Sequence, residues 1–597
     1  MTISFSQEFR RVLPWRPGLA LAALYWHLTR RRVRARNWLR RGLADAPFAY
    51  HVWGEGLERA QPDAAEVARI TARWPAVPTV CVAIVCPDGA KSDWCARALA
   101  SVRGQTYGAI QSIVAGPATL DHDNDEGPPV RVLPGPAGAS AAQLLAAAIA
   151  ANDCDYLVPV LPGTVLAASG VFRLVEALQA VSGAKMAYGD HDLANVRGER
   201  RDAWLKPVWN DDLALAQDFF SPGVLLQSTA ASGWGPSAPD APPVYDLVID
   251  RFLPGPGGED PVHCPHIVAH CHAHPDQVAT QPARAAVVRR KLAAAGVAVH
   301  LGRNGLIDLD WPLPDVPPLV SIIVPTRDKV ELLRPCIESV IGLTDYPAYE
   351  IVVVDNRSSD PDTLAYLAQI AQDPRIVVVP HDRDYNYAEI NNAAAARARG
   401  EYLCLLNNDT EVIEPGWLTL MMRQAVRPGV GAVGAKLLYA DRSIQHAGVV
   451  IGMGGAAGHA HRHQPDGEPG YFLQAHVQRR ALAVTAACLV VGRDRFERVG
   501  GLDQATFAIA YNDVDLCLKL DAAGLVNIYE PRAMLFHHES KSRGSDFDPT
   551  QMPRYLGELA ALQSRWDTRD RVDPLHHPAL DRTIEQYRID YRGISQS

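Results

Sequence analysis

One short segment occurs twice in this chain, and the repetition limits its possible folds more than any other feature. Residues 402–412 read YLCLLNNDTEV, and residues 156–166 read YLVPVLPGTVL. Both copies begin with tyrosine and leucine, continue as an apolar run and then reach a threonine. Before that threonine the later copy has Asp409, whereas the earlier copy has Gly163. The chain therefore carries one segment with a carboxylate and a second one without it.

The sequence around this segment is repeated as well. Pro87 and Pro325 lie 238 residues apart, and so do the serine–valine pairs at 101–102 and 339–340. A repeat of this length indicates a duplicated domain and not a solenoid. A chain of 597 residues is also too long for one hydrophobic core, which again predicts two or more domains.

Apolar runs alternate with amphipathic segments in both copies. We expect buried strands at 78–87, 111–116, 317–326 and 349–356, and helices at 94–107 and 332–347. Strand, helix and strand with apolar runs are typical of a parallel sheet. The predicted fold class is therefore α/β, with two tandem domains, each a mostly parallel sheet flanked by helices.

The boundaries of the regions follow from composition. We predict a basic helical segment over 1–75, a first domain over 76–310, a second domain over 311–550 and a helical tail over 551–597. The second domain begins with a Pro-rich linker, WPLPDVPPLV. A helix at 555–566 in the tail either packs on the second domain or forms an interface.

Charge and cysteine usage narrow the class of protein. The net charge of −9 indicates that the chain does not bind nucleic acid through overall charge. No apolar run reaches about 18 residues, so we expect no transmembrane helix. The ten cysteines are scattered, mostly in apolar runs, as expected for reduced core cysteines of a cytoplasmic protein. Examples are Cys81, Cys86, Cys404 and Cys488.

The segment 15–43 has a composition of its own. An apolar run at 19–28 precedes a group of arginines, namely Arg30, Arg31, Arg32, Arg34, Arg36, Arg40 and Arg41. The run is too short to span a bilayer, and its basic residues follow it, unlike those of a secretory signal. A basic helix with Trp15, Trp26 and Trp38 fits contact with an anionic membrane surface. The alternatives are a solvated helix that packs on its own protein and a basic tail that binds no RNA.

Polar residues follow several strands of the second domain. Asp355 ends one apolar strand and Asp409 ends another. Ligands of open parallel sheets bind at the carboxyl ends of strands, so both carboxylates should face one crevice. Oxygen ligands at such a tip hold a divalent cation, which would neutralise a diphosphate leaving group. Further candidates follow along the chain, namely Asp513, His537, His538 and Arg543.

The motifs of the second domain resemble those of a known family in their order and spacing. They include VSIIVPTRD, VVVDNRSSD, YNYAEINNAAA, GEYLCLLNNDTEVIEPGWL, AVTAACLVV, GGLDQATFAIAYNDVDLCLKL and HHESKSRG. This set resembles the bacterial family 2 inverting glycosyltransferases of the GT-A fold. The resemblance is strongest to two-domain enzymes, rhamnosyltransferases among them, that build O-antigen, capsule and other surface polysaccharides.

The resemblance implies a role for each candidate. Asp513 would be the general base that takes the proton from the acceptor hydroxyl. Asp409 and His537 would bind Mg²⁺ or Mn²⁺ on the diphosphate, with His538 close behind. Asn407 stands where many relatives have aspartate, but the last aspartate of the motif is present. The donor would contact Pro325, Thr326, Asp355, Asn356, Asn408 and Arg543.

The resemblance also implies the reaction and the partners. A nucleotide-sugar donor (dTDP-, UDP- or GDP-linked) would pass its sugar to a growing glycan, for which an undecaprenyl-type lipid carrier is expected. Attack opposite the leaving diphosphate would invert the anomeric centre in one step. A cytoplasmic enzyme that touches the inner membrane through its basic N-terminal helix would suit this acceptor.

The first domain resembles the same family but lacks the chemical groups. Gly116 stands where the second domain has Asp355, and Pro243–Val244 stand where the base is expected. Glycine, proline and valine side chains neither bind a cation nor accept a proton. The first domain is therefore predicted to be a degenerate copy that holds the acceptor, braces the second domain or mediates assembly.

A histidine- and cysteine-rich strand in the first domain leaves two interpretations open. It contains His263, Cys264, His266, His270, Cys271, His272 and His274. Such residues bind zinc when they converge in tetrahedral geometry. We favour ordinary structural histidines, because similar proteins have an apolar strand here.

Two other functions compete with glycosyl transfer. A non-catalytic scaffold of a polysaccharide assembly complex would be favoured by loss of Asp409 or Asp513, but both are present. A nucleotidyltransferase usually has a Gly-rich basic loop after its first strand. The corresponding loop here, PTRDKVELL, has no glycine.

Overall fold

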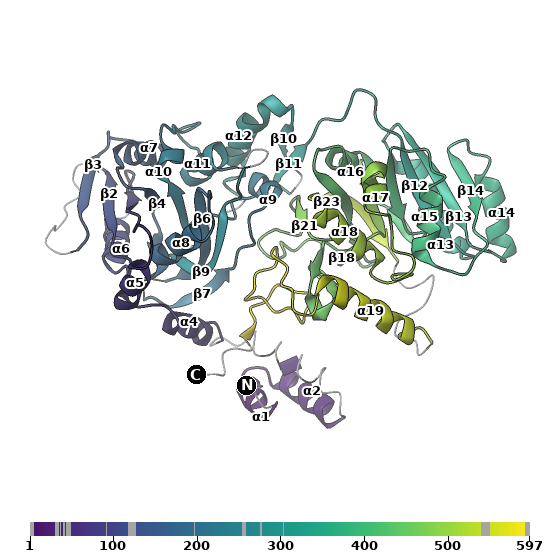
Figure 1. The fold of residues 1–597 in the computed structure, drawn as a ribbon, viewed down its shortest axis with the longest axis horizontal. Helices are drawn as coiled ribbons and strands as arrows, with labels where there is room; N and C mark the ends of the chain where they lie inside the picture. Colours follow the sequence, from purple (N-terminus) through teal and green to yellow (C-terminus); the bar gives the residue numbers. More distant parts are fainter. Residues whose placement is uncertain are drawn as a thin grey trace. The chain divides into compact units, whose positions relative to one another are not determined.

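The computed structural model describes residues 5–29, 35, 38–39, 42, 49–90, 92–117, 127–195, 197–253, 258–274, 278–302, 304–538 and 550–591. The chain divides into two compact units. The first unit comprises Met1–Lys291, His577–Asp581 and Arg588–Ser597. The second unit comprises Leu292–His576 and Arg582–Tyr587. Each unit has its own sheet with flanking helices, which Figure 1 draws with their labels.

The first unit contains nine described strands in one sheet. These are β1 (Val80–Val85), β2 (Ile110–Gly116), β3 (Val130–Pro134), β4 (Tyr156–Val160), β5 (Thr164–Leu166), β6 (Met186–Ala194), β7 (Arg200–Trp204), β8 (Val224–Gln227) and β9 (Val262–Cys271). Its helices are α1 (Phe5–Val12), α2 (Pro17–Leu28), α4 (Ala49–Arg59), α5 (Ala64–Thr71), α6 (Ser92–Arg103), α7 (Ala141–Ala151), α8 (Gly170–Gln179), α9 (Asp211–Ala216), α10 (Ser228–Ala231), α11 (Pro243–Arg251) and α12 (Gln281–Leu292).

The second unit begins near a short 3₁₀ turn, η1 (Ala293–Ala295), and a hairpin of β10 (Ala298–Leu301) and β11 (Ile307–Asp310). The strands of its large sheet are β12 (Val320–Thr326), β13 (Tyr349–Asp355), β14 (Ile376–Pro380), β15 (Tyr402–Leu406), β16 (Thr410–Val412), β17 (Val430–Leu438), β18 (Ile444–His446), β21 (Arg479–Ala481), β22 (Cys488–Gly492) and β23 (Val526–His537). A separate pair consists of β19 (Val449–Ile451) and β20 (Ala457–His459). Its helices are α13 (Val330–Leu343), α14 (Pro361–Ile370), α15 (Tyr387–Ala395), α16 (Trp417–Ala425), η2 (Met453–Gly455), α17 (Arg493–Arg498), α18 (Asn512–Ala522) and α19 (Met552–Trp566).

The two large sheets have the same strand order. The first runs β3-β2-β1-β4-β8-β6-β9-β5, and the second runs β14-β13-β12-β15-β22-β17-β23-β16. In each, the first four strands are parallel, the fifth and the last run opposite to their neighbours, and the sixth and seventh are parallel to each other. The α/β class with large, mostly parallel sheets agrees with the sequence-based prediction.

The sheet register corrects one match between the copies. Val80 begins β1 and Val320 begins β12, and each pairs with the tyrosine that starts its neighbouring strand. By this count Pro325 corresponds to Val85, so its match with Pro87 is wrong by two residues. The serine–valine pairs on the following helices do keep the offset of 238. The connection between first strand and first helix is therefore two residues longer in the first unit.

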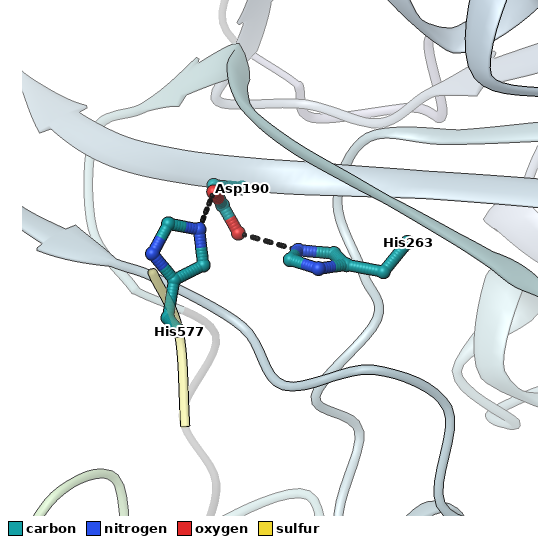
Figure 2. Close-up of side chains that lie close together, drawn as sticks. All are labelled: Asp190, His263 and His577. Atoms are coloured by element: carbon teal, nitrogen blue, oxygen red, sulfur yellow. Dashed lines mark hydrogen bonds and ion pairs between the residues drawn. The ribbon is translucent and has the colours of Figure 1, made fainter. Parts of the chain in front are cut away.

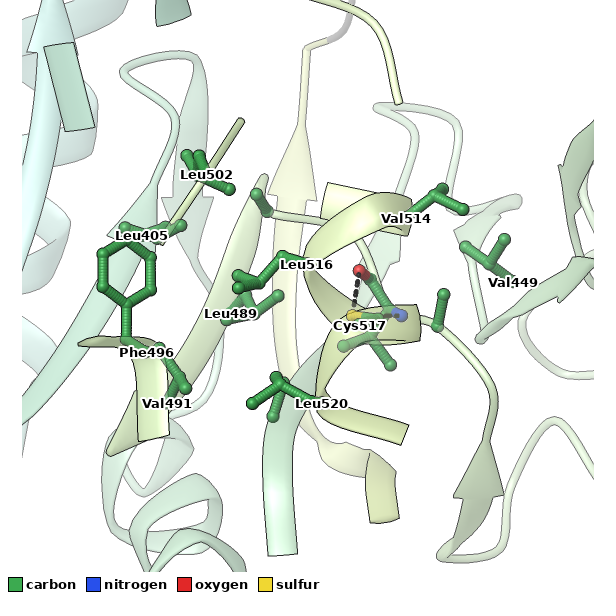
Figure 3. Packing of buried hydrophobic residues seen from close by; sticks show 14 of the residues in the cluster. Leu405, Val449, Leu489, Val491, Phe496, Leu502, Val514, Leu516, Cys517 and Leu520 are labelled. Carbon is green, nitrogen blue, oxygen red and sulfur yellow. Dashed lines mark hydrogen bonds between the residues drawn. The ribbon is translucent and has the colours of Figure 1, made fainter. Parts of the chain in front are cut away.

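Both faces of the second sheet are buried. Along β15, Leu403 and Leu405 belong to one hydrophobic cluster, whereas Cys404 and Leu406 belong to another. A strand covered on both faces needs apolar residues at every position, which explains the continuous apolar runs of the sequence. Figure 3 shows part of the first cluster, to which α18 contributes Val514, Leu516, Cys517 and Leu520. This packing fixes α18 on the sheet.

The cysteines differ from expectation at one position. Cys86 and Cys95 form a disulfide, with their Cα atoms 6.3 Å apart. The prediction that Cys86 is reduced is therefore wrong, because the end of β1 and the start of α6 bring the two residues within bonding range. Cys81, Cys404 and Cys488 are free and buried, as predicted.

The N-terminal helices expose large apolar side chains. Trp15, Leu21, Tyr25 and Leu28 are between 52% and 73% exposed. All seven arginines from Arg30 to Arg41 lie outside the described residues. Within the described part of the chain, no helix combines the length and apolarity needed to cross a membrane.

Candidate active site

Three predicted donor contacts lie at one edge of the second sheet. Asp355 is the last residue of β13, and its carboxylate accepts the backbone N–H of Ser358 at 3.0 Å. The sheet register places Asp355 opposite Thr326, the last residue of β12. The side-chain amide of Asn408 donates to the Thr326 hydroxyl at 3.1 Å. Thr326 thus connects the ends of β13 and β15, as expected for parallel strands.

The other predicted donor contacts are internal or undescribed. Asn356 is only 1% exposed, and its amide donates to the carbonyls of His381 and Arg383 at 3.0 and 2.8 Å. It fixes the loop that follows β14. Pro325 is buried within β12. Arg543 lies outside the described residues.

Asp409 and His537 converge from different parts of the chain. His537 ends β23 and pairs in register with Thr410, the residue after Asp409. The Nε2 atom of His537 lies 3.3 Å from a carboxylate oxygen of Asp409, and both side chains are less than 10% exposed. The backbone N–H of His538 donates to the Asp409 carbonyl at 2.9 Å. A cavity of about 460 Å³ borders both histidines.

This pair fits a divalent cation. A carboxylate oxygen and an imidazole nitrogen 3.3 Å apart are both metal ligands, and they lie close enough to bind one ion. The carboxylate suits Mg²⁺ and Mn²⁺ alike, because both prefer oxygen ligands. His538 is less well placed to bind the same ion, because its Nε2 faces another carboxylate, that of Glu411, at 3.5 Å.

Asp513 lies at the start of α18. One oxygen of its carboxylate accepts the backbone N–H of Ala486 at 3.0 Å. The helix N-terminus favours a negative charge at this place. Tyr511, just before the helix, has a φ of 62°, a left-handed conformation that is strained for a tyrosine. Strain of this kind is often found at functional sites.

The loop 484–487 connects the candidate base with the candidate metal ligand. Its Ala486 holds Asp513, and the carbonyl of Ala487 accepts the N–H of Asn407 at 3.0 Å. The Tyr387 hydroxyl donates to the Ala486 carbonyl at 3.1 Å. Burial raises the pKa of Tyr387 well above its ordinary value, and the Asp513 and Asp409 carboxylates add to the shift. Tyr387 therefore stays protonated as a donor beside the site.

Sequence reasoning did not assign roles to Tyr387 or Ala486. Both lie in the motifs that carried the family resemblance, YNYAEINNAAA and AVTAACLVV. Membership of those motifs was therefore the one sequence signal that could have pointed to these two residues. Nothing in the composition of the motifs shows that they meet at Asp513.

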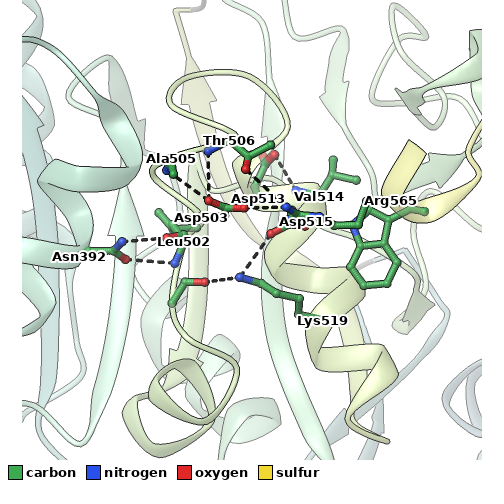
Figure 4. A network of polar contacts seen from close by, with 12 residues as sticks. Asn392, Leu502, Asp503, Ala505, Thr506, Asp513, Val514, Asp515, Lys519 and Arg565 are labelled. Atoms are coloured by element: carbon green, nitrogen blue, oxygen red, sulfur yellow. Dashed lines mark hydrogen bonds and ion pairs between the residues drawn. The ribbon is translucent and has the colours of Figure 1, made fainter. Parts of the chain in front are cut away.

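Asp515 has a role different from that of Asp513, two residues away. Its side chain is fully buried. Its carboxylate accepts hydrogen bonds from the Arg565 guanidinium and the Trp566 indole N–H, both at 2.9 Å. Lys519 lies 3.3 Å away. Figure 4 shows this network beside Asp513. The buried ion pairs exclude Asp515 as a base, because its carboxylate is already engaged by cations.

We expect Asp515→Asn to destabilise the second unit by about 2 kcal/mol, because the change removes the charge of a buried carboxylate that interacts with Arg565, Trp566 and Lys519. Urea unfolding followed by circular dichroism measures this. The matched control is Asp513→Asn on the same helix, which breaks no ion pair of the described residues and should change stability by less than about 1 kcal/mol. Equal loss in both variants would contradict the division of roles.

The C-terminal helix α19 supports the loop before Asp513. The Glu558 carboxylate, 4% exposed, accepts the backbone N–H groups of Ile509 and Ala510 at 3.1 and 2.9 Å. The hydroxyls of Tyr555 and Tyr511 are 2.8 Å apart. Of the two roles considered for this helix, the described residues support packing on the second unit.

The corresponding edge of the first sheet has the same backbone contacts but different side chains. The Gly163 carbonyl accepts the N–H of His272, as the Asp409 carbonyl accepts that of His538. Cys271 pairs with Thr164 in the sheet, as His537 pairs with Thr410. The candidate metal-ligand positions of the second unit thus correspond to glycine and cysteine here.

The histidine-rich strand β9 does not form one cluster. His263 lies 3.0 Å from Asp190, His270 lies 2.5 Å from Asp192, and His274 lies 3.1 Å from His191. Cys264 and Cys271 are free and buried. Within the described residues, the one group of three or more such side chains placed to hold a metal ion is Asp190, His263 and His577, whose ligand atoms all lie within 4.8 Å of one another (Figure 2).

Hydrogen bonding argues against a metal in this group. The Nδ1 atom of His577 accepts the backbone N–H of Ala579 at 3.0 Å, so the proton of the neutral ring is on Nε2. That Nε2 faces Asp190 at 2.9 Å. Asp190 also accepts the N–H of Lys206 at 2.8 Å. Asp190 thus accepts a backbone N–H from Lys206 and lies within 3.0 Å of both imidazole rings, contacts that a buried structural carboxylate makes without a metal ion.

Comparison with known proteins places part of this site in a family. Residues 321–493 match the sequence model of glycosyl transferase family 2. This segment spans β12 to β22 and includes Asp355, Asn408 and Asp409. The second unit therefore contains a family 2 glycosyl transferase domain, and the resemblance noted from the motifs is confirmed.

Particular relatives extend over more of the chain. The uncharacterized protein y4gI of Sinorhizobium fredii is 35% identical over 556 residues, which are 88% of this chain and 60% of that protein. The O-antigen biosynthesis protein RfbC of Myxococcus xanthus is 35% identical over 413 residues, 67% of this chain and 32% of that protein. The chain thus spans 60% or less of the length of these two relatives.

One similar solved structure is a mannosyltransferase of Pyrobaculum calidifontis in complex with GDP-Man and Mn²⁺. It is 20% identical, with 45% of this chain and 69% of that chain covered and a TM-score of 0.33. A score this low supports no inference about this chain.

Proposed function

We propose that the protein is a metal-dependent inverting glycosyltransferase that moves a sugar from a nucleotide-diphosphate donor to a growing surface polysaccharide or lipid-linked glycan. The observation that carries the proposal is the arrangement around loop 484–487. This loop binds the Asp513 carboxylate and the backbone just before Asp409, which faces His537 at 3.3 Å. One loop thus contacts both the candidate base and the segment that carries Asp409, and this loop lies within the residues that match the family 2 model.

Asp513 is the group proposed to accept the proton of the acceptor hydroxyl. Such a hydroxyl is a weak nucleophile at neutral pH, so a carboxylate within hydrogen-bond reach must take its proton. The Ala486 N–H fixes the orientation of this carboxylate. No covalent enzyme intermediate is needed. Burial raises the pKa of Cys336, close to Thr410, to about 12, which leaves that thiol unreactive.

Asp409 and His537 are proposed to hold the Mn²⁺ or Mg²⁺ ion. When bound, the ion supplies positive charge that stabilises the departing diphosphate. Asp355 and Thr326, with Asn408 behind them, are proposed to contact the nucleotide at the sheet edge, and His538 the diphosphate. Arg543 keeps its proposed role as a phosphate contact.

The acceptor and location are also proposals. The likeness to an O-antigen biosynthesis protein supports a polysaccharide or lipid-linked acceptor. The exposed side chains of Trp15, Leu21, Tyr25 and Leu28 support a peripheral contact of the N-terminal helices with the cytoplasmic face of the inner membrane. We further infer that the first unit is a second GT-A-like domain without catalytic groups, which the shared strand order of the two sheets supports.

Calorimetric binding of nucleotide sugars tests the proposal. We expect one donor among dTDP-, UDP- and GDP-linked sugars to bind to the full chain with Mn²⁺ and to lose affinity at least about a hundredfold in EDTA, since the metal neutralises the diphosphate. Binding that is insensitive to EDTA would contradict the metal dependence. No binding by any donor would favour the non-catalytic scaffold.

A further inference from the structure

The first unit keeps a cavity at the place that corresponds to the candidate active site of the second. It has a volume of about 450 Å³. Its lining includes Gly163, Val244 and Cys271, which occupy the positions of Asp409, Asp513 and His537. The catalytic groups were therefore replaced, but the space at the sheet edge was not filled.

The walls of this cavity are unsuited to a metal diphosphate. They include Trp94, Leu161 and Val244, together with several prolines and no carboxylate at the metal position. Cys271 is buried with its thiol 3.8 Å from the Thr164 hydroxyl, and burial raises the pKa of this thiol to about 12. A neutral thiol is a poor ligand for Mg²⁺ or Mn²⁺. One position of this cavity corresponds to the proposed place of the donor diphosphate in the second unit. We therefore expect the part of a ligand at that position to be uncharged.

The cavity also has polar groups deep in its wall. Asp218 and Arg284 line it, and they are 8% and 1% exposed. Asp218 accepts the N–H of Ser221 at 3.0 Å, and the Arg284 guanidinium donates to the Thr280 hydroxyl at 3.0 Å. Burial raises the pKa of Asp218, and the charge of Arg284 opposes this shift. These contacts hold both groups in fixed positions.

An aromatic and apolar wall beside fixed polar groups suits a sugar ring. One face of a pyranose is apolar and packs on aromatic side chains, whereas its hydroxyls need hydrogen-bond partners in fixed positions. A purely apolar isoprenoid chain would leave the buried Asp218 and Arg284 facing hydrocarbon, which is unfavourable. Trp94 offers the aromatic surface, since it is only partly buried and lines the cavity beside His272.

We propose that this cavity binds a neutral pyranose unit of the glycan acceptor, so that the degenerate unit is a glycan-binding module. The identification of the sugar as part of the acceptor rests on the proposed function. Binding of a neutral sugar by the cavity itself does not.

Saturation-transfer NMR on the full chain tests the proposal without donor and in EDTA. The probes are the methyl glycosides of L-rhamnose, D-glucose, D-galactose and D-mannose and, as an apolar alternative, farnesyl phosphate. We expect at least one glycoside to bind and to bind about fivefold or more weakly to Trp94→Ala, which loses the aromatic surface. Val244→Trp, which fills the cavity, should have the same effect.

Two control variants locate the signal. Val181→Ala changes an exposed residue of the first unit, and Asp409→Ala changes the candidate metal site. Both should leave glycoside binding unchanged. If Val244→Trp does not fold, as judged by circular dichroism, the effect of Trp94→Ala by itself shows whether the cavity binds the glycoside.

The proposal is overturned by any of four results. These are no binding of any glycoside, binding unaffected by Trp94→Ala, binding lost in Asp409→Ala, or binding of farnesyl phosphate alone. The outcome is independent of the donor experiment. Glycoside binding by a protein that binds no nucleotide sugar would remove the proposed enzyme activity and leave the glycan-binding cavity in place.

Discussion

Asp513→Asn should reduce sugar transfer by about 10²- to 10⁴-fold, the usual contribution of a general base. Asparagine keeps the size of the side chain and can still accept the Ala486 N–H, but it cannot take a proton from the acceptor hydroxyl. Donor affinity should stay within about threefold of wild type, because the Asp409–His537 pair is unchanged. Transfer is measured as release of nucleoside diphosphate with the donor found by calorimetry.

The structure provides a control for this variant. Glu558→Gln acts on the loop before Asp513 without removing the base, since Glu558 accepts two N–H groups of that loop. It should lower transfer less than Asp513→Asn, and transfer by Glu558→Gln should keep the pH profile of the wild type. If Asp513→Asn retains more than about a tenth of the wild-type rate, the base lies elsewhere.

Asp409→Ala should abolish the dependence of donor binding on Mn²⁺. Alanine removes the carboxylate that faces His537, and a lone imidazole is a weak site for a hard cation. We expect the donor to bind at least about a hundredfold more weakly in the presence of Mn²⁺, and EDTA to cause little further change. Calorimetry with and without Mn²⁺ measures both effects.

His537→Ala separates metal binding from general damage to the site. It should weaken Mn²⁺-dependent binding by a smaller factor, of about tenfold, because Asp409 remains as a ligand. Asp441 also lines the cavity beside His537, but it lies on the surface, and Asp441→Asn should leave metal dependence unchanged. Metal dependence retained in Asp409→Ala would remove this residue from the proposed site.

Much of the fold follows from local patterns. Apolar runs at 80–85, 320–326 and 349–355 became buried strands within three residues of their predicted bounds. A strand covered on both faces needs apolar side chains along its whole length, so this signal is contained within a few neighbouring residues. The match of Pro87 with Pro325 failed because the loop between the first strand and the first helix needs no fixed length, unlike a strand that must keep its apolar residues in register.

The candidate site was predictable only in part. Asp355 and Asp409 follow strands, and parallel strands bring their carboxyl ends to one edge, so their shared location follows from the pattern. The different roles of Asp513 and Asp515 do not follow from the pattern, because both residues lie in the polar first turn of the same helix. Only the approach of Arg565 and Trp566, fifty residues further on, shows that Asp515 is structural.

The sequence by itself determined the α/β class, the repeated segment and the presence of Gly116 and Gly163 where the second copy has carboxylates, since these depend on residue type along the chain. Tertiary structure alone decided that His537 faces Asp409 across two strands and that His577 joins Asp190. Contacts of this kind depend on strand register and on the packing of distant segments. No local pattern of side chains encodes them.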